Sequence, residues 1–299
     1  MKKIIRFNRF FPAAVVLSSV LIILGIVSLC TRGINWGLEF KPGQNIQVSI
    51  SGEGVDSDKI ASVLAEKGFN AAVKAAGTEN SYQIRTGSAE NIESAVKSAL
   101  VSSFGEDKVS IEQSQAISPQ FSSSLIKGSI VLVLLTLVLI FLYCIIRFKW
   151  DFALASVIAI VHDAMIMIAF LSVSQLEFTT TSIAAILTII GYSINATVVI
   201  LDRVRSDMKL SEAKNFTEIL NGALSGTLSR SIITTITTLF AVLSLVFFTA
   251  GDIKNFAIAL VVGLISGCYS SIFIAGAFIN AVRKNWKPAK TNVVQFKAE

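Results

Sequence analysis

Charge is scarce in this 299-residue sequence, and so are the residue types that carry most enzyme chemistry. Charged residues make up 15% and hydrophobic residues 53% of the chain, whereas a soluble domain of this size has about 25% charged residues. There is one histidine, His162, and there is no CxxC motif, no HExxH motif and no Walker-type phosphate-binding loop. The composition predicts a membrane protein that is not an enzyme and that holds no metal and no cofactor.

Cysteine is also rare. Cys30, Cys144 and Cys268 each lie in or beside an apolar run. Because none of them falls in the long polar segment, a disulfide framework is excluded there. We expect all three to be buried as small apolar residues.

The net charge is +6, so a nucleic-acid partner has to be considered. The basic residues, however, cluster at the ends of apolar runs and form no stripe interleaved with aromatic residues. That is the pattern of a membrane protein whose basic segments stay in the cytoplasm. It excludes nucleic acid as a partner and predicts contact with membrane lipids.

Six apolar runs are long enough to cross a membrane. They cover residues 10–29, 125–146, 152–172, 178–201, 217–248 and 256–282. Lys and Arg are concentrated before the first run, in the 147–151 and 202–216 links and in the tail, whereas the other two links hold only Lys254. This pattern predicts that both termini lie in the cytoplasm of a bacterium and that the segment after the first span lies in the periplasm.

The polar segment between the first two spans has the pattern of a small α+β domain. Strand-like runs at 45–50, 69–75, 81–86 and 108–117 alternate with helical patterns that open at Asp56 and Asn91. The order is βαββαβ, that of a ferredoxin-like domain. The predicted organisation is a cytoplasmic N-terminus with the first transmembrane helix (1–30), a periplasmic ferredoxin-like domain (31–124), a five-helix transmembrane bundle (125–282) and a cytoplasmic tail (283–299).

The fourth span is unusually polar. Its segment GYSINATVVILDRVR carries four polar side chains at membrane depth: Tyr192, Ser193, Asn195 and Thr197. Lipid offers no hydrogen bonds, so these groups need partners on other helices, in a working site or in a packing seam. At the end of the segment we expect Asp202, Arg203 and Arg205 to form a helix-end motif that caps the span and anchors it on the cytoplasmic side.

Two ionisable residues within the spans are candidates for proton relay or coupling, because such residues are expensive in lipid. At about 1.5 Å per residue, Asp163 lies roughly 18 Å beyond Asp151, near the midplane, and Arg230 lies roughly 30 Å before Gly251, near the cytoplasmic border. The alternatives are that Asp163 only satisfies polar groups inside the bundle and that Arg230 extends to the interface. His162 suits a packed polar residue better than a ligand or relay.

The sixth span carries Gly263 and Gly267, four residues apart. Small residues at this spacing let two helices approach closely. We expect a helix-packing role for both.

Five segments together resemble one family. GYSINATVVILDRVR, RFKWDFALASVIAIVHD, TLSRSIITTITTL and FAIALVVGLISGCYSSIFIA match in order and spacing, and GLEFKPG after the first span is similar to the family's short motif except at Glu39, Lys41 and Pro42. The chain resembles the SecF family of protein-export membrane subunits, part of the SecD/SecF group of the RND superfamily. The resemblance implies pairing with SecD, action beside the SecYEG translocon with YajC as a further partner, and use of the proton-motive force to move a translocating preprotein at a late stage of export across the inner membrane.

One position departs from the family pattern. Ala196 stands where the family has an aspartate that the resemblance pairs with Arg230, and alanine cannot bind a proton. At about 1.5 Å per residue, Ala196 lies about 9 Å from Asp202 along the helix, close to the depth of Arg230. Three explanations stay open. The relay runs through other groups, such as Asp163 or an acid on SecD; this subunit is scaffolding; or another ion is bound by the oxygens of Ser193, Asn195 and Thr197.

Two other functions compete with this one. The chain could be a half-unit of an RND-type exporter of small molecules or lipids, but such exporters carry about twice as many spans in one chain. An intramembrane hydrolase built on His162 would need a nucleophile at membrane depth, and the sequence points to none.

Overall fold

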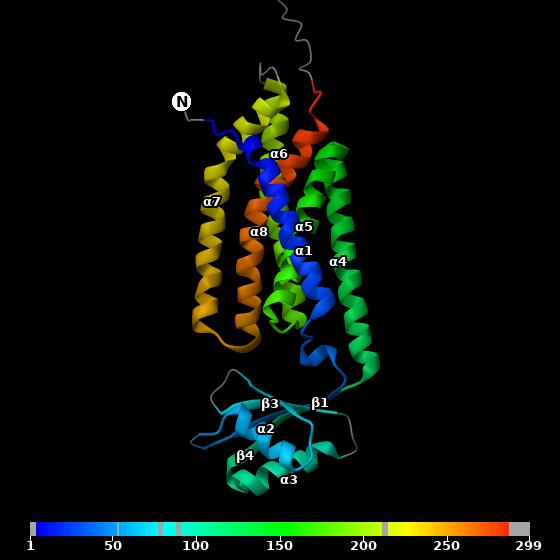
Figure 1. Ribbon diagram of the computed structural model, residues 1–299, viewed down its shortest axis with the longest axis vertical. Coiled ribbons are helices and arrows are strands. Elements are labelled where there is room, and N and C mark those ends of the chain that lie inside the picture. Colours follow the sequence, from blue (N-terminus) through cyan, green and yellow to red (C-terminus); the bar gives the residue numbers. More distant parts are fainter. Residues whose placement is uncertain (1–3, 53, 77–79, 88–90, 211–214, 287–299) are drawn as a thin grey trace, which may run out of the picture.

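The computed structural model of this chain describes residues 4–52, 54–76, 80–87, 91–210 and 215–286. They form a long helical bundle with a small α/β domain at one end (Figure 1). The start of the first helix and the end of the last lie at the opposite end of the bundle from this domain (Figure 1). Residues 211–214 of the predicted 202–216 link and the predicted tail beyond residue 286 lie outside the described residues.

Six helices among the described residues are long and apolar enough to cross a membrane, which confirms the predicted architecture. They are α1 Phe11–Thr31, α4 Pro119–Arg147, α5 Trp150–Ser174, α6 Thr180–Leu210, α7 Phe216–Phe248 and α8 Gly251–Val282. Helix α8 is central, since 56% of its most apolar stretch is buried, compared with 6% in α4. The inner helices α5, α6 and α8 are therefore the place for buried polar groups.

Helix α6 does not end where the sequence suggested. The link expected to begin at Asp202 is helical as far as Leu210, so Asp202, Arg203 and Arg205 lie inside a helix and the expected helix-end motif is wrong. An ion pair one turn apart, Arg203 with Asp207, favours continuation of the helix. The charged residues mark the end of the apolar stretch, which is not the end of the helix.

The α/β domain has the predicted βαββαβ order. Its elements are β1 Gly43–Ile50, α2 Ser57–Glu66, β2 Ala72–Ala75, β3 Ser81–Thr86, α3 Ile92–Phe104 and β4 Val109–Ile117. The antiparallel sheet has the strand order β2-β3-β1-β4. Ile46, Val48 and Ile84 on one sheet face are fully buried with Leu64 of α2 and Leu100 of α3, which places the core of the domain between the sheet and its two helices.

The other face of the sheet is polar and is turned toward the bundle (Figure 1). Gln83, Gln47 and Gln113 stand side by side across three strands. Together with Glu177 and other polar groups they line a cavity of about 190 Å³ between the sheet and the bundle. Burial lowers the pKa of the neighbouring Arg85, although the Glu177 carboxylate opposes that shift.

The segment after α1 ties this domain to the bundle. The backbone of Gly37 donates to Phe178 O at 2.8 Å, and a Cβ at this glycine would lie 2.9 Å from the same oxygen. Glu39 accepts hydrogen bonds from the backbone N–H of Thr180, at 2.8 Å, and from its hydroxyl, at 3.1 Å. Glu39, which departs from the family motif, thus accepts a hydrogen bond from the first N–H of α6. Lys74 of β2 forms an ion pair with Glu177, which precedes α6.

The three cysteines differ in burial. Cys144 is buried and Cys268 is half-buried, whereas Cys30 is exposed on α1. The expectation that all three are buried is wrong for Cys30, because α1 lies at the edge of the bundle with most of its surface uncovered.

Candidate functional site

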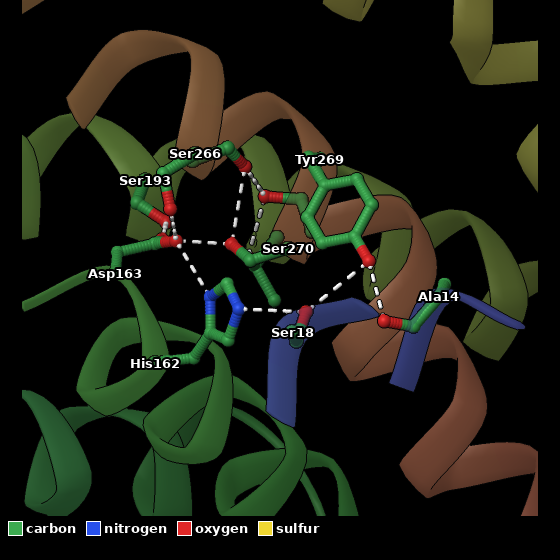
Figure 2. Close-up of polar contacts among 11 residues, drawn as sticks. Ala14, Ser18, His162, Asp163, Ser193, Ser266, Tyr269 and Ser270 are labelled. Atoms are coloured by element: carbon green, nitrogen blue, oxygen red, sulfur yellow. Dashed lines mark hydrogen bonds and ion pairs between the residues drawn. The ribbon is translucent and has the colours of Figure 1, made fainter. Parts of the chain in front are cut away.

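Asp163 is the centre of a buried polar cluster in the middle of the bundle (Figure 2). Its side chain is fully buried. Oδ2 accepts from the hydroxyls of Ser193 at 2.6 Å and Ser270 at 2.7 Å, and Oδ1 accepts from Ser266 at 2.6 Å. His162 Nδ1 lies 3.2 Å from Oδ1. The carboxylate therefore joins α5 to α6 and α8 through hydroxyl donors, as a buried charge requires.

The cluster continues from His162 to the first helix. His162 Nε2 lies 2.9 Å from Ser18 Oγ. The Ser18 hydroxyl donates to Tyr269 OH at 3.1 Å, and Tyr269 OH donates to the backbone oxygen of Ala14 at 2.7 Å. Figure 2 shows this chain of contacts running from Asp163 to α1. Four helices thus meet at one hydrogen-bond network.

Ser18, His162 and Asp163 have the sequence of contacts seen in serine hydrolases. The sequence pointed to no nucleophile for His162, and the structure corrects this by placing a serine hydroxyl on its Nε2. Ser18 is only 4% exposed and lies in the middle of α1, where backbone N–H groups are used by the helix. An oxyanion needs free donors beside the nucleophile, and the helical backbone around Ser18 does not supply them.

Two glycines allow α8 to pack closely on α5 and α6 beside the cluster. A Cβ on Gly263 would lie 2.4 Å from Ile189 Cγ1 and 2.9 Å from Met167 Sδ, and one on Gly267 would lie 3.2 Å from Ser193 Cβ. Because these positions are glycines, the α8 backbone packs directly on α5 and α6. Ser266 and Ser270 are thereby brought within reach of Asp163.

The polar residues of α6 are divided between two faces of that helix. Ser193 and Thr197 face inward and are fully buried. Ser193 donates to Asp163, and the Thr197 hydroxyl lies 2.9 Å from that of Ser271 on α8. These two residues belong to the cluster and its packing seam.

The other α6 residues face α7 across a second site. A cavity of about 300 Å³ is lined by Tyr192, Asn195, Ala196 and Val199 of α6 and by Arg230, Ser231, Thr234, Thr237 and Thr238 of α7. The structure brings Ala196 and Arg230 to the same cavity, as their calculated depths predicted. Asp163 is not among the lining residues, so its cluster and the Arg230 cavity are separate sites.

Polar contacts and ion pairs hold the helices together at the end of the bundle opposite the α/β domain. Arg147 donates to Asp202 at 2.9 Å, and Arg205 donates to the backbone oxygen of Arg147 at 2.9 Å. Arg283 at the end of α8 pairs with the buried Asp151 at the start of α5. Asp202 and Arg205 thus fix α6 to α4, whereas Arg203 pairs within its own helix.

Sequence reasoning missed most partners of Asp163. Ser266 and Ser270 are one turn apart on α8, a spacing that could have identified them as one polar face. Ser18 and Tyr269 carried no comparable signal. Among the described residues, no group of three or more His, Cys, Asp and Glu side chains could hold a metal ion.

Comparison with known proteins identifies the family. Residues 96–285 match the model described as "Protein export membrane protein SecD/SecF, C-terminal", and residues 27–52 match the "SecD/SecF GG Motif". A protein translocase subunit SecF of Borreliella burgdorferi is 34% identical over 96% of this chain and 100% of its own length. The chain belongs to the SecF family.

Two further SecF-family matches cover more of this chain than of the relative. The SecF subunit of Treponema pallidum is 47% identical over 64% of this chain, which is 46% of that protein. The crystal structure of SecDF from Thermus, described as a translocon-associated membrane protein, matches 95% of this chain with a TM-score of 0.83 and 29% identity. This chain spans 39% of that SecDF chain.

Proposed function

We propose that this chain is the SecF-type subunit of a bacterial protein translocase. It acts with a SecD-type partner beside a SecYEG channel, where the two subunits use the proton-motive force to drive late export of a preprotein. YajC is a further candidate partner. The observation that carries this proposal is the likeness to SecDF over nearly the whole chain, which spans 39% of that SecDF polypeptide.

The proposed location is the inner membrane, with both termini in the cytoplasm. The end of α4 and the end of α6 lie at the same end of the bundle as the start of α1 and the end of α8 (Figure 1). Arg147, Arg203 and Arg205 belong to these parts of α4 and α6, and basic residues favour the cytoplasmic side. The α/β domain at the other end would then lie in the periplasm, where an exported chain emerges.

Within this chain we assign the proton step to Asp163. An ionised carboxylate accepts from all three serines, whereas a protonated one has a hydrogen to donate and fewer free lone pairs. Proton uptake would therefore replace at least one contact to α6 or α8. Two arrangements of the same helices, biased by one proton, are the kind of two-state element that couples a gradient to movement. The series of hydrogen-bond contacts from Asp163 through His162, Ser18 and Tyr269 offers a path for that proton toward α1.

The proposal is tested by expressing the tagged chain together with SecD from the same genome. We expect SecD to co-purify. We also expect vesicles that contain both subunits and SecYEG to export a preprotein faster when a proton gradient is imposed. A chain that purifies without SecD, and that moves drugs or lipids across vesicles on its own, would instead identify an RND-type exporter.

A further inference from the structure

The cavity between α6 and α7 has the chemistry of an anion site. Among the described residues that line it, Arg230 is the only charged one. Among the described residues, no carboxylate lies within ion-pair distance of the Arg230 guanidinium. An arginine at membrane depth is expensive without a counter-charge. The helix that faces it contributes the methyl group of Ala196 at the position nearest in depth, which leaves space where a side-chain acid would otherwise stand.

Hydrogen-bond donors converge on the same space. Ser231 is only 6% exposed, yet its hydroxyl has no partner among the described residues, and it lines the cavity. The amide of Asn195 is likewise unpaired there. Tyr192 OH lies 3.4 Å from the Thr238 hydroxyl, whose one hydrogen goes to Thr234 O, so the Tyr192 hydrogen is directed to Thr238.

The threonine hydroxyls in the wall offer no hydrogen to a ligand in the cavity. Thr234 donates to Arg230 O, Thr237 to Ile233 O, and Thr238 to Thr234 O. Their hydrogens are used within α7. Among the described residues that line the cavity, the free hydrogens therefore belong to a guanidinium, a buried serine and an amide, and none of these residues is an acid.

We propose that this cavity binds a small inorganic anion, with chloride as the probe, as the counter-ion of Arg230. The guanidinium supplies the charge, and Ser231 and Asn195 supply neutral donors. The cavity volume of about 300 Å³ accommodates a partly hydrated ion. This inference concerns the chain alone and does not depend on the export proposal.

The test uses the full chain, purified in an uncharged detergent that contains no phosphate. Its unfolding temperature is measured while gluconate is replaced by chloride at constant ionic strength. A ligand that binds only the folded state raises this temperature with saturation. We expect such a saturating rise in the wild type. Equal unfolding temperatures in chloride and gluconate would overturn the proposal for the wild type. A rise with chloride that disappears when phosphate-containing lipid is added would instead assign the site to a lipid phosphate and would also overturn it.

Matched variants separate a bound anion from a general salt effect. In Arg230→Gln the apparent dissociation constant for chloride should rise about 10- to 100-fold, since a charge-assisted hydrogen bond is worth about 1.5–3 kcal/mol. Arg230→Lys keeps the charge and should keep a chloride response. An unchanged response in Arg230→Gln would contradict the assignment.

The sharpest comparison is between Ala196→Asp and Ala196→Asn. Both add a side chain of nearly the same size to the cavity wall, but only the aspartate brings a fixed negative charge. We expect the aspartate variant to lose the chloride response and the asparagine variant to retain it. Equal responses in the two variants would overturn the proposal. A bromide-soaked crystal provides a direct check, with an anomalous peak expected beside Arg230.

Discussion

The two polar sites of the bundle lie on opposite faces of α6 and are in opposite states. The Asp163 cluster is closed, because the carboxylate is fully buried and its oxygens receive three serine hydroxyls. The Arg230 cavity is open, because Arg230 is exposed and no acid among the described residues lines the space around it. Helix α6 thus lies between a carboxylate of α5 that receives hydrogen bonds from the chain's own residues and an arginine of α7 that faces no acid among the described residues. We expect the Asp163 cluster to determine the stability of the bundle and the Arg230 cavity to respond to the anions in the surrounding solution.

The largest effect should come from opening the closed site. Asp163→Val leaves three serine hydroxyls without their acceptor, and each buried polar group left unsatisfied lowers the free energy of unfolding by about 1–3 kcal/mol. Denaturant unfolding in micelles measures this loss. Asp163→Asn keeps the shape and one acceptor, so its loss should be smaller. Wild-type stability in Asp163→Val would show that the cluster does not hold the helices together.

The next effect should come from separating α8 from its neighbours. In Gly263→Ala the new Cβ would lie 2.4 Å from Ile189 and 2.9 Å from Met167, and overpacking of this kind costs about 1–3 kcal/mol. The matched control is Gly222→Ala on α7, where nothing lies within 4 Å of a Cβ. That control should gain up to about 1 kcal/mol from helix propensity. Equal effects of the two changes on unfolding would contradict the close packing.

A smaller effect is expected where the α/β domain meets the bundle. Glu39→Ala removes the acceptor of the first N–H of α6, and loss of an N-cap costs about 0.5–2 kcal/mol. Hydrogen exchange should become faster in the first turn of α6 and stay unchanged at its far end. Glu39→Gln keeps an uncharged acceptor and serves as the control. Protection that is unaffected in Glu39→Ala would remove this residue from the cap.

The smallest effect should come from the open site. With gluconate as the only anion, Arg230→Gln should change the free energy of unfolding by no more than about 0.5 kcal/mol, as is usual for exposed residues without partners. The contrast with Asp163→Val in the same unfolding assay is the test. A loss of several kcal/mol in Arg230→Gln would mean that the arginine has a structural partner after all.

The fold was largely predictable because its signals are local. Apolar runs reveal the spans, and alternating patterns reveal the βαββαβ domain. The end of α6 was missed because the ion pairs of Arg203 and Asp202 favour helix beyond the apolar stretch, and one of those pairs involves a residue on another helix. Depth counting placed Ala196 beside Arg230, since both positions depend only on helix rise.

The partners of Asp163 could not be predicted in the same way. Ser266 is 103 residues away in the chain, and it approaches only because Gly263 and Gly267 allow α8 to pack closely. Ser18 reaches His162 because α1 crosses α5 at that level. Such contacts depend on helix rotation and on packing, and a single sequence states neither.

We propose that Asp163 carries the proton step in this chain. It is tested most directly by exporting a preprotein from vesicles that contain this chain, SecD and SecYEG, with and without an imposed proton gradient. Asp163→Asn is compared with Ser270→Ala, which removes one of the three hydroxyl donors but keeps the carboxylate. We predict that Asp163→Asn exports at the same rate with and without the gradient and that Ser270→Ala still responds to it. Full stimulation by the gradient in Asp163→Asn would contradict the claim.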